Sequence, residues 1–214
     1  MSNTPSLPWK RLITEGAVIV GSILLAFAID AWWDGHKDNE DLREILSLVK
    51  LETDANLAVL ADSTARHVDI HAAIETAKDA RSIATVYRRA VIQVEVFEPT
   101  SNALNTLVST GTLGLIDDFD LRLALMAIEG FSRDLAEREL AAVSFRNEAR
   151  RRIASLGVRI SEEIPPSSTS FTDIEVLNLL TMRAVEEQHA IDAGRKLAAH
   201  LQSISAKLDA LSNP

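Results

Sequence analysis

The chain of 214 residues has no cysteine and few residues that break helices. Without cysteine it has no disulfide, no thiolate metal ligand and no cysteine nucleophile. It has eight glycines and six prolines, and no glycine lies between Gly35 and Gly111. Such a stretch favours long helices over many short strands joined by turns.

Basic residues are also scarce relative to acidic ones. Lys and Arg number 22 against 31 Asp and Glu, which gives a formal net charge of −9. Nucleic acid is therefore not an expected partner, because neutralising phosphates needs a basic face.

Sequence motifs typical of catalytic, phosphate-binding or calcium-binding sites are absent as well. No serine lies in a Gly-x-Ser-x-Gly elbow, and the scattered glycines form no phosphate-binding loop. Asp117, Asp118 and Asp120 lack the glycine and the bidentate glutamate of a calcium loop, so they are expected to cap a helix. The sequence predicts a protein that is not an enzyme and uses no cofactor.

Two histidines are the only weak candidates for metal ligands. His67 and His71 are four residues apart, which places both on one face of a helix, with Glu75 one turn further on. His189 and His200 could approach them if two helices pack antiparallel. Two histidines without a located third ligand make no site, so they are interpreted as solvated side chains on an exposed face.

One long apolar segment stands near the N-terminus. From Gly16 to Ile29 the only polar residue is Ser22. A helix over residues 12–33 would be roughly 33 Å long, enough for a hydrocarbon core of about 30 Å. The sequence therefore predicts a short tail at 1–11 and a transmembrane helix at 12–33.

Two alternatives to a span were weighed. In a cleavable export signal, Lys10 and Arg11 would be the basic start and Ala26-Phe27-Ala28 the small-x-small cleavage site. The chain continues past Asp30 without a helix breaker before that site, which favours the span. A buried core helix is disfavoured because no other segment is apolar enough to surround it. The Lys/Arg count slightly favours a cytoplasmic N-terminus and an extracytoplasmic remainder.

Polar and small side chains in this segment define a candidate membrane and partner face. Glu15 and Asp30 lie within roughly 60° of each other on a helix and near the two headgroup regions. They are read either as interfacial carboxylates or as a stripe facing a partner helix. Small-x-x-x-small pairs permit close helix packing, and Trp residues mark the interface. The candidate residues are Glu15, Ala17, Gly21, Ser22, Ala26, Asp30, Trp32 and Trp33.

Beyond the span the pattern is helical throughout. Residues 34–98 are expected to form long stalk and bundle helices, in which the segment near 80–96 runs into an extended stop before Pro99. Residues 99–214 are expected to form the rest of the bundle, with long helices at about 118–156 and 173–212 separated by a loop at 162–170. A short helix at 100–110 would be capped by Thr100 or Ser101 and ended by Gly111. The predicted fold class is all-α, with one N-terminal transmembrane helix followed by a bundle of long helical hairpins.

Two stretches, "GSILLAFAIDAWWD" and "SNALNTLVSTGTLGLIDDFDLRLAL", carry a resemblance. They resemble a family of uncharacterised bacterial single-pass membrane proteins, of the domain-of-unknown-function kind, with a span ending in an acidic and tryptophan motif. The matching positions are Asp30, Trp32, Trp33, Ala103, Leu104, Gly111, Leu115, Ile116, Asp117, Leu121 and Arg122. The resemblance implies anchoring in the bacterial inner membrane and no known activity.

Three functional hypotheses remain. The first is a non-enzymatic, membrane-anchored helical module that binds another membrane protein or itself. The second is an extracytoplasmic ligand-sensing domain that signals through a partner. A metal-dependent enzyme is the third and rests on His67 and His71 alone.

Overall fold

The structure is a computed structural model that describes residues 9–77, 80–158, 160 and 172–212. The chain is all-helical, with no strand among these residues, and it has a long N-terminal helix, as the sequence predicts. The long helices are α1 (Trp9–Thr76), α4 (Phe119–Ser155) and α5 (Ile174–Ser212). The short elements are α2 (Ala80–Thr85), the π-helical turn η1 (Arg88–Ile92), α3 (Asn102–Ser109) and the 3-10 turn η2 (Thr112–Leu115). The loop predicted at 162–170 lies outside the described residues.

The chain divides into two compact units, Met1–Ile45 and Leu46–Pro214. In the first unit, α1 begins at Trp9 and runs through Gly35 without a break. Asn39 donates from Nδ2 to the carbonyl oxygen of Gly35 at 2.8 Å. This side-chain bond adds to the helical backbone at the point where glycine would otherwise weaken the helix.

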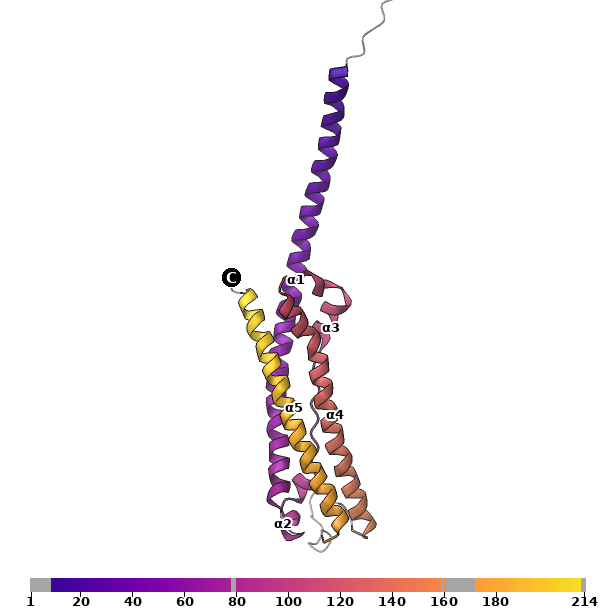
Figure 1. Cartoon of the computed structure of the whole chain (residues 1–214), viewed down its shortest axis with the longest axis vertical. Coiled ribbons are helices and arrows are strands. Elements are labelled where there is room, and N and C mark those ends of the chain that lie inside the picture. Colours follow the sequence, from indigo (N-terminus) through magenta and orange to yellow (C-terminus); the bar gives the residue numbers. More distant parts are fainter. Residues whose placement is uncertain (1–8, 78–79, 159, 161–171, 213–214) are drawn as a thin grey trace, which may run out of the picture. The chain divides into compact units, whose positions relative to one another are not determined.

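In the second unit, α1, α4 and α5 share an apolar core. One cluster joins Ile70 of α1, Ile153 of α4 and Leu180 of α5 with Tyr87 and Val91 near η1. A second cluster joins Leu60 of α1, Leu135 of α4 and Leu197 of α5. The helices α4 and α5 lie side by side (Figure 1). Each fully buried Leu or Ile contributes about 1.5–3 kcal/mol relative to an exposed one, so this shared core holds the long helices together.

Side-chain caps set the ends of α4 and α5. Asp118 accepts a hydrogen bond from the backbone N–H of Leu121 at 3.0 Å, which confirms the capping role predicted for this carboxylate. Asp173 accepts from the N–H groups of Glu175 and Val176 and is bound in turn by Arg152 of α4 at 2.6 Å. The end of α4 is therefore tied to the start of α5.

The cap of α3 differs from the prediction. Ser101 occupies the N-cap position, but its side chain makes no capping hydrogen bond. Glu52 of α1 instead accepts from the N–H of Ala103 at 2.9 Å and contacts that of Leu104 at 3.5 Å. A carboxylate is the better acceptor for the positive end of a helix, and this one also joins α3 to α1. Gly111 follows α3 in the left-handed conformation with φ of 77°, as the predicted helix end requires.

Candidate functional site

The apolar segment in the first unit is exposed over its whole length. Among the described residues, α1 contains the one stretch that is long and apolar enough to cross a membrane, with a mean hydropathy of 1.8 and no buried residue in its most apolar window. Val18, Leu25 and Phe27 are 63%, 62% and 67% exposed. Apolar surface costs about 25 cal/mol per Å² in water, so covering this segment with apolar groups would be favourable.

The small residues of the candidate face are open to contact. A Cβ added at Gly21 would meet no atom within 4 Å in the described chain. Ser22 donates from Oγ to the carbonyl oxygen of Val18 at 2.7 Å, so its hydroxyl is already satisfied inside the helix. Ser22 can therefore lie in an apolar environment without a polar partner.

Helix geometry separates the candidate residues into two faces. At about 100° per residue, Ser22 and Ala26 each lie roughly 20° from Glu15 around the axis, and they lie roughly 80° and 40° from Asp30. Ala17 and Gly21 lie on the other side of the helix. Among the candidate residues, the carboxylates thus share a face with Ser22, Ala26 and Trp33.

The two tryptophans near the end of the segment are exposed and in contact with each other. The ring centroids of Trp32 and Trp33 are 6.3 Å apart, and Trp32 stacks on His36 at 5.7 Å. Both indoles are more than 60% exposed. Amphipathic rings in this position suit a headgroup region.

The second unit contains a buried ionic network around His67. The expectation that His67 lies on an exposed face is wrong, because its side chain is 2% exposed. Its Nδ1 lies 2.6 Å from Oε2 of Glu187, and its Nε2 lies 3.1 Å from Oε1 of Glu139. An ionised carboxylate only accepts hydrogen bonds, so both ring nitrogens donate and His67 is an imidazolium.

The two glutamates extend the network to further elements. Glu139 of α4 accepts from the backbone N–H of Phe97 with both oxygens, at 3.0 and 3.1 Å. Glu187 of α5 accepts from Nε of Arg183 at 2.9 Å. Arg183 also donates to the carbonyl oxygens of Ala90 and Gln93, at 2.8 and 2.9 Å. One network therefore joins α1, α4, α5 and the segment that follows α2.

Charge balance explains the protonation of His67. Glu139 and Glu187 carry two negative charges in the interior, and Arg183 supplies one positive charge. Burial lowers the pKa of His67, but its hydrogen bonds to Glu139 and Glu187 outweigh that effect and raise the pKa to about 9. The imidazolium is the second positive charge, and with it the buried groups sum to zero.

The four candidate histidines do not converge. His71 contacts the carbonyl oxygen of Ala184 at 3.0 Å, and His189 lies 3.2 Å from Glu186. His200 bonds the carbonyl oxygen of Ala124 at 2.8 Å. The carboxylates beside His67 lie on opposite ring nitrogens, so the three groups cannot point at one ion. Within the part of the chain that the structure describes, no group of three or more His, Asp or Glu side chains could hold a metal ion.

Sequence reasoning missed Glu139, Arg183 and Glu187, although a signal for them exists. Glu139 falls on the apolar stripe of its helix, between Leu135 and Ala142. The charges of Arg183 and Glu187 likewise interrupt the stripe of α5. A charge at a core-facing position of a regular helix predicts a buried partner, because unpaired buried charges are costly.

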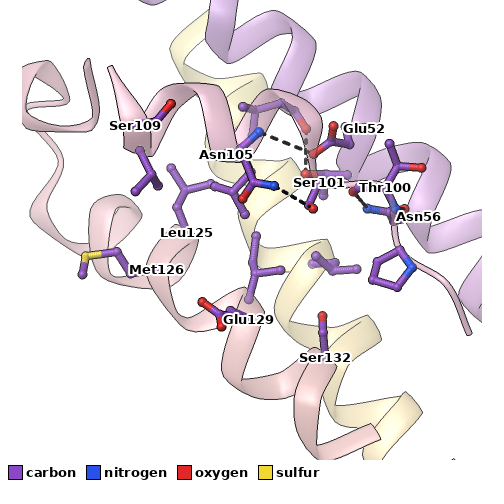
Figure 2. A pocket seen from close by; sticks show the side chains of 17 residues that line it. Glu52, Asn56, Thr100, Ser101, Asn105, Ser109, Leu125, Met126, Glu129 and Ser132 are labelled. Carbon is purple, nitrogen blue, oxygen red and sulfur yellow. Dashed lines mark hydrogen bonds between the residues drawn. The ribbon is translucent and has the colours of Figure 1, made fainter. Parts of the chain in front are cut away.

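A cleft lies between α1, α3 and α4 (Figure 2). Its volume is about 560 Å³, which is in the range of small-molecule sites. Most of its surface is apolar, with Leu104, Leu125 and Ile128 among the lining side chains. Glu129 and Ser132 of α4 also line it (Figure 2).

Neither a family model, a curated protein nor a solved structure matches this chain.

Proposed function

We propose that this protein is a non-enzymatic, membrane-anchored helical module that acts as a subunit of a membrane complex. The supporting observation is the exposed apolar stretch of α1, which is long enough to span a bilayer and ends at Trp32 and Trp33. The proposed location is the bacterial inner membrane, with the N-terminus in the cytoplasm. The part beyond the span would be a bundle of long helical hairpins on the other side.

The partner face of the span is proposed to be the one that carries Glu15, Ser22, Ala26 and Asp30. Small side chains allow two helices to approach closely, and carboxylates near the two headgroup regions can bind polar groups of a neighbouring helix. The opposite face, with Ala17 and Gly21, would contact lipid. The partner is another membrane protein or a second copy of this chain.

Two matched double variants test this proposal. Ser22→Leu with Ala26→Leu fills the proposed partner face, and Ala17→Leu with Gly21→Leu fills the other one. Both keep the span apolar, and Gly21 has open space for the larger side chain. Each full-length variant would be solubilised in mild detergent and purified by its tag, with a second copy of the chain carrying a different tag.

Mass spectrometry and the second tag then identify what is retained. We expect wild type and the Ala17/Gly21 variant to retain the same membrane protein or second copy, and the Ser22/Ala26 variant to lose it. The proposed face would be contradicted if no partner co-purified with wild type, or if both variants retained the partner equally.

A further inference from the structure

The cleft between α1, α3 and α4 is held open by hydrogen bonds that do not depend on a ligand. Asn56 of α1 donates to the carbonyl oxygen of Thr100 at 2.7 Å and accepts from its N–H at 2.9 Å. Glu52 fixes the start of α3, and Asn105 donates to Ser101 at 3.1 Å (Figure 2). The wall opposite α4 is therefore preformed, and a preformed apolar wall lowers the entropic cost of binding.

The charges of the cleft are of one sign. Its lining residues include two carboxylates, Glu52 and Glu129, and no Lys, Arg or His among those that the structure describes. Glu52 is engaged by the N–H groups of α3. Glu129 stands at the rim with its side chain 80% exposed and pairs only along its own helix with Arg133. The lining therefore offers an anionic ligand no positive partner, whereas a cation could pair with Glu129 in place of Arg133.

We propose that this cleft binds a small amphiphile with an apolar body and a single positive charge. The body would cover Leu104, Leu125 and Ile128, and the ammonium-type head would lie beside Glu129 and displace Arg133 from it. Most of the affinity would come from burying the apolar body, because an exposed ion pair contributes little. Among ligands of the same shape, the charge of the head group would then determine which one binds most tightly. This proposal goes beyond membrane anchoring and does not depend on it.

Three probes with one apolar body separate these contributions. They are 4-phenylbutylammonium, 4-phenylbutanol and 5-phenylpentanoate, each of which has a phenyl ring and four methylenes. Titration calorimetry on the full-length protein in lipid nanodiscs, with empty nanodiscs as the blank, gives the three affinities. We expect the cation to bind more tightly than the alcohol by less than about fivefold, because an exposed ion pair contributes at most about 1 kcal/mol and Arg133 must give up its own pair with Glu129. The carboxylate is expected to bind most weakly.

Two substitutions test the geometry of the cleft. Glu129→Lys changes an exposed side chain and is expected to reverse the order, so that the carboxylate binds more tightly than the cation. Ser132→Trp fills the cleft and is expected to weaken all three probes at least tenfold. Ser144→Trp, at an exposed position of the same helix outside the cleft, is the matched control and should change none of them.

The following outcomes would overturn the proposal. They are no binding of any probe beyond the blank, equal affinity of cation and carboxylate in wild type, and full binding by the Ser132→Trp variant. An effect of Ser144→Trp as large as that of Ser132→Trp would also overturn it, because the loss would then not be specific to the cleft.

Discussion

The protonation of His67 makes the stability of this protein dependent on pH in the alkaline range. The pKa of His67 is about 9 in the folded chain, against 6.5 for an unperturbed histidine. A raised folded pKa gives stability that is fully present below the unfolded pKa and is lost as the pH rises through the folded pKa. The groups that face His67 are Glu139 and Glu187, and Arg183 faces Glu187.

We therefore expect the free energy of unfolding to fall between pH 6.5 and pH 9, by at most about 1.4 kcal/mol per pH unit. Urea unfolding of the full-length protein, followed by circular dichroism from pH 6 to 10, measures this slope. His67→Gln should remove this slope and destabilise the protein at neutral pH, by about 3 kcal/mol, because it leaves buried charges unpaired. His189→Gln is the control, since His189 is exposed and pairs only with Glu186. A slope that His67→Gln leaves unchanged would show that another group titrates.

Gly194 lies at a close approach of α5 to α1. A Cβ added there would lie 2.8 Å from Oγ1 of Thr64, closer than real contacts allow. Gly194→Ala should therefore destabilise the wild-type chain, although alanine is the better helix former by about 1 kcal/mol. In a Thr64→Ala background the same change should be stabilising, because the obstructing oxygen is gone. Thermal unfolding of wild type, the two single variants and the double variant gives the coupling energy between Thr64 and Gly194. Additive effects of the two substitutions on stability would contradict this contact.

At the scale of single elements, Glu52 connects the capping of α3 to the wall of the cleft. Glu52→Ala removes the acceptor for the first N–H groups of α3 and should cost about 1 kcal/mol of unfolding free energy. Glu75→Ala, at an exposed position of the same helix, should change stability by less than about 0.5 kcal/mol. Hydrogen exchange of the Ala103 amide should rise in the first variant alone. Unchanged protection there would mean that the cap is not needed.

The sequence predicts the helical elements better than their contacts. A helix over the apolar segment near the N-terminus, the capping role of Asp118 and the turn at Gly111 follow from local patterns, and each of these three is confirmed. The burial of His67 does not follow, because its partners Glu139 and Glu187 come from helices distant in the sequence. Likewise, the cap of α3 comes from α1 and not from the neighbouring Ser101. Local sequence preferences indicate where a helix lies along the chain. Which side chains meet across two helices depends on how the helices pack.

Across the whole chain, the two units differ in where their apolar side chains lie. The first unit exposes apolar side chains over a span-length helix, and the second buries an apolar core and an ionic network. A stretch of this length and hydropathy suits a bilayer, whereas the apolar side chains of the second unit gather in buried clusters. We therefore propose that α1 anchors this protein in a membrane.

Because the chain has no cysteine, single cysteines can report directly on this claim. Three full-length variants would each carry one cysteine, at Ser2, at Leu24 in the apolar stretch, or at Ala55 on the exposed face of α1. Bacterial cells with a permeabilised outer membrane would be treated with a membrane-impermeant maleimide before and after disruption of the inner membrane. We expect Ala55→Cys to be labelled before disruption, Ser2→Cys only afterwards, and Leu24→Cys only in denaturant. Labelling of Leu24→Cys in undisrupted membranes, or loss of the Ser2 residue from the mature chain, would contradict a membrane-spanning α1.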